Sequence, residues 1–160
     1  DYQRSRGLGD VYKRQPIETT ITSMQGGGGK RDQMTAGGLC GFGTLLDPSI
    51  TTADNLSGQV LAKKGELPEI RTECSIQVNL MKNMVAGDGE EPETIHPLRN
   101  NEMLMVNVAT STSVGIVKGV EKNNANLHLR LPICADKGQR VSLSRRVGAR
   151  WRLIGHGTIQ

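Results

Sequence analysis

An alternation of apolar and polar residues with a period of two restricts the fold of this chain more than any other feature. Residues 72–80 show it most clearly, because every second residue is apolar and the residues between them are polar. The same pattern returns over residues 104–108, 125–131, 141–144 and 151–159. Successive side chains of a strand point to opposite faces, so each run predicts a strand with one buried and one exposed face. No segment has a convincing apolar stripe at helical spacing, and the predicted fold class is all-β.

Turn-forming residues separate the predicted strands. They lie at Lys122-Asn123-Asn124, Lys137-Gly138-Gln139 and Val147-Gly148-Ala149. Asparagine and glycine tolerate the positive φ angles that tight hairpins need. Gly115 and Gly119 lie inside an apolar run and predict bulges or corners of a curled sheet. Six short strands in about ninety residues therefore predict a closed antiparallel β-barrel, which has no exposed strand edges.

The last predicted strand contains the only tryptophan of the chain. Alternation places Trp151, Leu153 and Ile159 on one face of this strand. We therefore expect Trp151 to anchor the core at one end of the barrel rather than to stack on nucleic-acid bases.

The segment before this barrel differs in composition, because glycines interrupt its strand-like stretches and a polar stretch follows them. Two or three strands in about 45 residues cannot bury an adequate core alone. We interpret residues 16–62 as the C-terminal part of an incomplete β-barrel, residues 63–71 as a linker and residues 72–160 as a nearly complete barrel. Residues 1–15 have no period of either kind and are interpreted as a leader outside the domains, a cloning or sequence-assembly remnant. A basic nucleic-acid-binding arm is the alternative, and the whole chain is expected to be a fragment of a longer protein.

Cysteine usage and hydropathy argue against several classes of protein. The three cysteines lie far apart and form no C-x-x-C pair, which argues against a disulfide scaffold and against a cysteine-based zinc site. No apolar run reaches the roughly 18 residues of a membrane span. We expect a soluble, cytoplasmic protein with no membrane partner.

Longer motifs point to one family. They are GGLCGFGTLLDPSITTADNL over Gly37–Leu56, followed by Gly58-Gln59-Val60 and Leu67-Pro68-Glu69, then NEMLMVNV over Asn101–Val108 and SRRVGARWRLIGHGTI over Ser144–Ile159. Together they resemble domains two and three of the gamma subunit of translation initiation factor 2, the archaeal and eukaryotic factor. The arrangement also resembles, less specifically, the paired β-barrels of elongation-factor-type GTPases.

The resemblance implies two consecutive barrels of the translational-GTPase type, the first of them incomplete, and a role in translation initiation. Members of the family deliver initiator methionyl-tRNA to the small ribosomal subunit as part of a trimer with alpha and beta subunits. GTP and magnesium are expected in an N-terminal G domain that this chain lacks. The fragment itself is then a non-catalytic scaffold with no cofactor. The alternatives are the same barrels from an elongation-factor-type GTPase, or a stand-alone RNA-binding β-barrel.

The glycine tract Gly26–Lys30 invites comparison with a phosphate-binding loop. Such a loop needs G-x-x-x-x-G-K-[ST], because its backbone N–H groups cradle the phosphates and its hydroxyl binds magnesium. Met24 stands at the position of the first glycine, and Arg31 stands at the position of the hydroxyl. We therefore expect a flexible hairpin loop here, and no binding or hydrolysis of GTP by this fragment.

A basic cluster near the C-terminus is the strongest candidate contact surface. Between Asp136 and Arg152, six basic residues stand against one acidic residue, a net charge of +5. The candidate contact residues are Arg140, Arg145, Arg146, Arg150 and Arg152. Guanidinium groups suit phosphate recognition, whereas adjacent Arg145 and Arg146 point to opposite faces of a strand, so at least one of them is expected to pair within the protein. Nucleic-acid contact and interdomain pairing both remain open.

The remaining candidates are weaker. Gly41 and Gly43 would let a ligand or another backbone approach closely, or would merely allow a barrel corner. The resemblance implies that this part of domain two lies near the aminoacyl end of the tRNA. The three histidines, His96, His128 and His156, do not have the spacing of metal ligands. No serine or cysteine lies in the sequence context of a nucleophile elbow. No catalytic or metal-binding residue is predicted.

Overall fold

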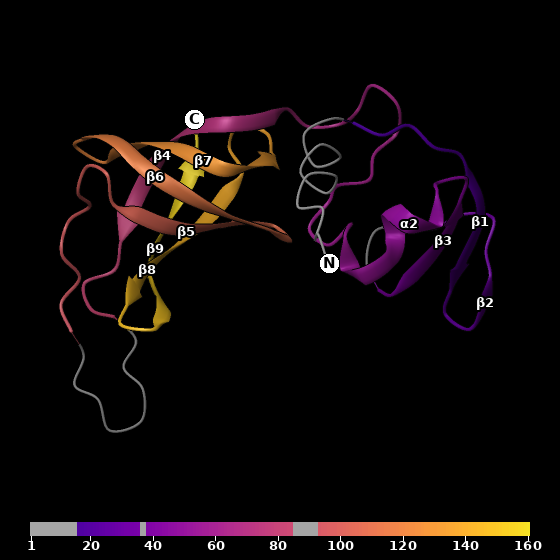
Figure 1. Ribbon diagram of the computed structural model, residues 1–160, viewed down its shortest axis with the longest axis horizontal. Coiled ribbons are helices and arrows are strands. Elements are labelled where there is room, and N and C mark those ends of the chain that lie inside the picture. The colour runs from indigo at the N-terminus through magenta and orange to yellow at the C-terminus, as the bar shows by residue number, and fades with distance from the viewer. Residues whose placement is uncertain (1–15, 36–37, 85–92) are drawn as a thin grey trace, which may run out of the picture. The chain divides into compact units, whose positions relative to one another are not determined.

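The computed structural model describes residues 16–35, 38–84 and 93–160. The predicted leader, residues 1–15, and most of the acidic loop over residues 87–97 lie outside the described residues. The chain divides into two compact units, residues 1–56 and residues 57–160 (Figure 1). Each unit is described by itself.

The C-terminal unit is a closed β-barrel in which neighbouring strands are antiparallel and follow the order β4-β7-β6-β5-β8-β9 (Figure 1). The strands are β4 (Ile70–Leu80), β5 (Met103–Val108), β6 (Ser111–Glu121), β7 (Asn124–Cys134), β8 (Arg140–Val147) and β9 (Arg150–Ile159). Each strand contains a run of alternating or apolar residues singled out above. The predicted all-β class and the closed barrel are therefore confirmed.

The barrel core consists of the apolar side chains that alternation turns inward. In β5, Leu104, Val106 and Val108 are buried and the residues between them are more exposed. The largest fully buried side chains are Ile76, Leu104, Leu127, Ile133, Leu143, Ile154, Ile159, Val106, Val108 and Val117. They come from all six strands, so the core depends on closure of the barrel.

Two glycines of β9 let this strand lie close against β4. A Cβ on Gly157 would overlap Ile76 Cγ2 and lie 2.7 Å from the carbonyl oxygen of Gln77. A Cβ on Gly155 would overlap the carbonyl oxygen of Asn79. Any side chain at either position would therefore push β9 away from β4.

A β-bulge turns Trp151 to the face of β9 opposite to the predicted one. The register between β8 and β9 shifts between Leu143 and Ser144, because Leu143 pairs with Gly155 whereas Ser144 pairs with Leu153. Ile154 is the extra residue, and it is buried. One inserted residue reverses the inward and outward faces on one side of the bulge. Ile159 therefore points into the core while Trp151 and Leu153 are 37% and 44% exposed, and the expectation that Trp151 anchors the core is wrong.

The hairpin turns lie where the sequence predicts them, with one difference in their chemistry. In the β6–β7 turn, Glu121 pairs with Asn124, and Lys122 has a φ of 52°. A lysine therefore takes the left-handed conformation that was expected of the asparagines. In the β8–β9 turn, Gly148 has a φ of 60° and supplies that conformation at no steric cost.

The segment that leads into β4 is fastened to the barrel. The Ser111 hydroxyl donates to the carbonyl oxygen of Gly58. The Cys134 thiol donates to the carbonyl oxygen of Pro68 at 3.1 Å, and the N–H of Ala135 donates to the carbonyl oxygen of Glu69 at 3.0 Å. Parts of the predicted linker thus pack on the barrel. The predicted boundaries at residues 62 and 71 remain predictions.

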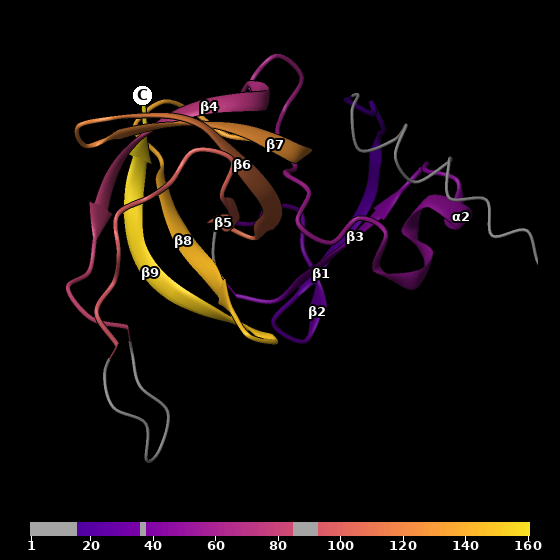
Figure 2. The same ribbon diagram turned by 60° about the vertical axis from the view of Figure 1, so that its left-hand side comes forward.

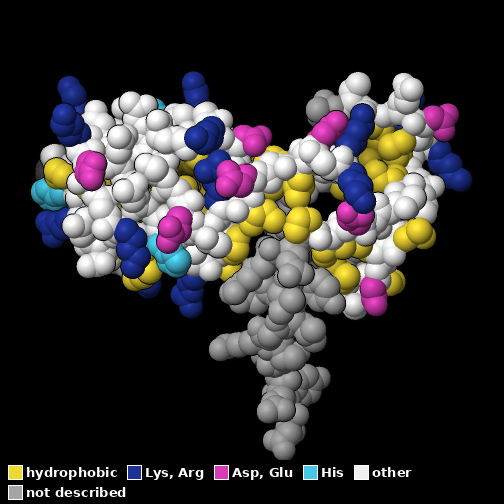
Figure 3. Space-filling view, turned by 90° about the horizontal axis from the view of Figure 1, so that it is seen from above, with side chains coloured by type: hydrophobic (Ala, Val, Ile, Leu, Met, Phe, Trp, Pro, Cys, Tyr) yellow, Lys and Arg dark blue, Asp and Glu magenta, His cyan; other side chains and the backbone are white. Residues whose placement is uncertain are grey.

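The N-terminal unit contains a three-stranded antiparallel sheet in the order β2-β1-β3. Its strands are β1 (Ile21–Gly26), β2 (Gly29–Lys30) and β3 (Cys40–Thr44). None of the described residues of this unit is buried, and Leu39 and Leu45 are among its exposed apolar side chains. Figure 3 shows hydrophobic side chains at its surface. A sheet that buries so little lacks a core, which agrees with an incomplete barrel.

A short helix, α2 (Pro48–Thr51), follows this sheet. The N–H of Ser49 donates to the Asp47 carboxylate at 2.8 Å, which caps the helix and holds the pKa of Asp47 below its ordinary value. Proline at the first helical position fits this start, because its missing N–H would have no partner there. Among the described residues, no helix has the length and apolar character needed to cross a lipid bilayer.

Candidate functional site

The arginine-rich candidate surface is the hairpin formed by β8 and β9, which run side by side as two curved strands (Figure 2). Arg145 pairs across the hairpin with Arg152, and Arg146 pairs with Trp151. Arg150 lies directly after the turn, and Arg140 begins β8. The five predicted contact residues therefore lie on one hairpin, but they do not share one face.

Arg145 is held inside the barrel unit rather than offered to a partner. Its Nε donates to one carboxylate oxygen of Glu102, and its Nη2 donates to the other oxygen at 3.2 Å. Its Nη1 also donates to the carbonyl oxygen of His96 at 3.0 Å. The two side chains of the ion pair are only 18% and 14% exposed. This bidentate pair ties β8 to the residue before β5, and the geometry favours the structural role for Arg145.

Arg140, Arg146 and Arg150 are exposed. The Nε of Arg146 donates to the carbonyl oxygen of Gly148 at 3.3 Å, so this side chain folds back over the turn. Arg152 is half-buried. Exposed guanidinium groups on one hairpin can bind phosphates or carboxylates, and the choice between nucleic acid and another domain remains a prediction.

The two candidate glycines lie in β3 of the N-terminal unit. A Cβ on Gly41 would meet nothing within 4 Å, so a ligand or another backbone has room to approach there. A Cβ on Gly43 would overlap the hydroxyl of Ser23 and lie 3.0 Å from Oγ1 of Thr22. Gly41 is therefore the stronger candidate for close approach, while Gly43 is explained by its packing against β1.

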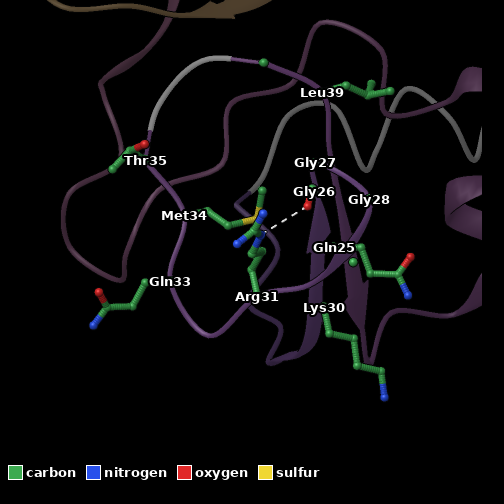
Figure 4. A pocket seen from close by; sticks show the side chains of 13 residues that line it. Gln25, Gly26, Gly27, Gly28, Lys30, Arg31, Gln33, Met34, Thr35 and Leu39 are labelled. Carbon is green, nitrogen blue, oxygen red and sulfur yellow. Dashed lines mark hydrogen bonds between the residues drawn. The ribbon is translucent and has the colours of Figure 1, made fainter.

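Gly41 also borders an open hollow beside the glycine-rich hairpin (Figure 4). Gly26 and Gly29 pair across the turn, and Gly27 and Gly28 have φ angles of 58° and 90°. The Arg31 side chain turns toward this hairpin, where its Nε donates to the carbonyl oxygen of Gly26 at 3.2 Å (Figure 4). The glycine tract is thus a β-hairpin turn, as predicted, with none of the strand-to-helix geometry of a phosphate-binding loop.

The histidines and cysteines form no cluster. His128 Nδ1 lies 3.2 Å from a carboxylate oxygen of Glu73 on the exposed face of β4 and β7. Burial raises the pKa of the Cys74 thiol to about 11, against a smaller opposing effect of Arg71. Burial and the nearby Asp136 carboxylate also raise the pKa of Cys134. In the described part of the chain, no group of three or more histidine, cysteine or acidic side chains could hold a metal ion.

An exposed apolar surface beside the arginines is made by Met103, Trp151 and Leu153. Alternation in β5 already turns Met103 outward, whereas the exposure of Trp151 and Leu153 follows from the bulge, whose position the sequence does not reveal.

Comparison with known proteins agrees with this architecture. The family model described as "Initiation factor eIF2 gamma, C terminal" matches residues 72–159, which is nearly the whole barrel. Translation initiation factor 2 subunit gamma of Methanothermobacter thermautotrophicus is 46% identical over 144 residues, which cover 90% of this chain and 35% of that protein. The subunit gamma of Methanococcus aeolicus is 47% identical over 152 residues, covering 95% of this chain and 37% of that protein. The Pyrococcus furiosus protein of the same name is 41% identical over 149 residues, covering 92% of this chain and 36% of the relative.

Proposed function

The chain belongs to the family of translation initiation factor 2 gamma subunits, and we propose that it is the barrel part of a GTP-dependent carrier of initiator methionyl-tRNA. The chain spans about a third of the length of the curated relatives that it matches. In this proposal the missing remainder includes a G domain that holds GTP and magnesium. The proposed partners are initiator methionyl-tRNA, the alpha and beta subunits and the small ribosomal subunit, which implies a cytoplasmic location.

The observation that carries the proposal is the match of the family model over residues 72–159, which form the closed barrel. The barrel core is continuous through six strands, and the Arg145–Glu102 pair fastens β8 to the start of β5. A closed, well-packed barrel is a rigid body. It suits a support that positions tRNA and subunits, and that rotates as a unit when a nucleotide-binding domain changes state.

The proposal assigns no catalytic step to this chain. In the described residues, His96, His128 and His156 lie on different elements, and the buried Cys74 thiol has a raised pKa that disfavours the reactive thiolate. The chain is proposed to be non-enzymatic, with hydrolysis supplied by the remainder of the protein.

A chimaeric gamma subunit tests this function. The 160 residues replace the matched segment of the Methanothermobacter thermautotrophicus protein, and filter binding measures affinity for methionylated initiator tRNA in the presence of a GTP analogue. We expect affinity within about threefold of the parent protein, a difference of about 0.7 kcal/mol. Elongator methionyl-tRNA serves as the matched control ligand, and it should bind more weakly.

Other outcomes favour the alternatives. Equal affinity for initiator and elongator tRNA would support an elongation-factor-type carrier. Tight binding of tRNA by the 160 residues alone would support a stand-alone RNA-binding barrel. Loss of all tRNA binding by a correctly folded chimaera would contradict the proposal.

A further inference from the structure

We draw no further inference here: the strongest candidate, the small hollow between the end of β4, the β6–β7 turn and residues 97–98 that Val78, Leu80 and Val120 line beside Lys122, carries no proposal because nothing in the structure shows what covers it.

Discussion

At the scale of single residues, the arginine hairpin contains two kinds of side chain. Arg145 has both oxygens of the Glu102 carboxylate and a backbone carbonyl as partners, and it is largely buried. Arg146 and Arg150 are exposed to solvent. The same residue type on neighbouring positions therefore stabilises the barrel in one case and is available to a partner in the other.

The Arg145–Glu102 pair gives the first prediction. Arg145→Gln should lower the free energy of unfolding by about 2–4 kcal/mol, because it leaves the Glu102 carboxylate half-buried without its cation. Arg146→Gln is the matched control and should stay within about 0.5 kcal/mol of the parent chain. Urea unfolding followed by circular dichroism measures both. Equal effects of the two substitutions would contradict the structural role of Arg145.

The buried thiol of Cys74 gives a pH-dependence. Its pKa is raised by burial to about 11 in the folded chain, so the neutral thiol is favoured by folding. The corresponding stability is complete below the pKa of the unfolded chain and is lost as the pH rises toward 11. We expect Cys74 to account for a loss on the order of 1–2 kcal/mol between pH 8 and pH 11.

The measurement is urea unfolding under reducing conditions at both pH values, for the parent chain and for Cys74→Ala. The substitution removes this contribution, so the variant should lose less stability than the parent chain as the pH rises. All other side chains are identical in the two proteins, so their contributions cancel in the comparison. An identical pH-dependence would rule out Cys74 as its source.

At the scale of strands, close packing of β9 on β4 depends on glycine. Gly157→Ala should lower the free energy of unfolding by about 1–3 kcal/mol, because the new Cβ would overlap Ile76 and approach the backbone of Gln77. Gly41→Ala is the matched control for an exposed strand with open space, and it should change stability by less than about 0.5 kcal/mol. Thermal unfolding of the two variants distinguishes packing glycines from glycines that leave room for a ligand. A neutral Gly157→Ala would show that β9 can move away from β4 at no cost.

The strand scale also shows what could be predicted from the sequence. The alternation in β4 and β7, together with the turn residues, was sufficient for the barrel, because a period of two is a local property of the chain. The face of Trp151 was not predictable in this way, since the bulge at Ile154 depends on pairing with β8. Strand alternation predicted that Arg145 or Arg146 would pair within the protein, but not that Glu102 is the partner of Arg145, because this pair joins residues distant in the chain.

At the scale of the whole molecule, the two units differ in completeness. The barrel over residues 57–160 has a continuous core, whereas the described residues of the first unit bury no side chain. A sheet without a core gains little from apolar burial. The incomplete first barrel is consistent with matches that cover only 35% and 37% of two relatives.

The exposed arginines give a prediction at this scale as well. In the chimaeric gamma subunit, the double substitution Arg146→Glu and Arg150→Glu should leave the salt-dependence of tRNA affinity unchanged if these arginines contact protein rather than RNA. Filter binding across a salt series measures this, because removing a phosphate contact reduces the slope by about one per contact. A reduced slope would instead assign these arginines to tRNA contact.

The central claim is that this chain is a non-catalytic support whose nucleotide chemistry lies in the remainder of the gamma subunit. Equilibrium binding of a fluorescent GTP analogue, together with phosphate release from GTP, tests it most directly in the isolated 160 residues and in the chimaera. We predict binding by the chimaera and neither binding nor hydrolysis by the isolated chain. Saturable GTP binding or turnover by the isolated chain would contradict the claim.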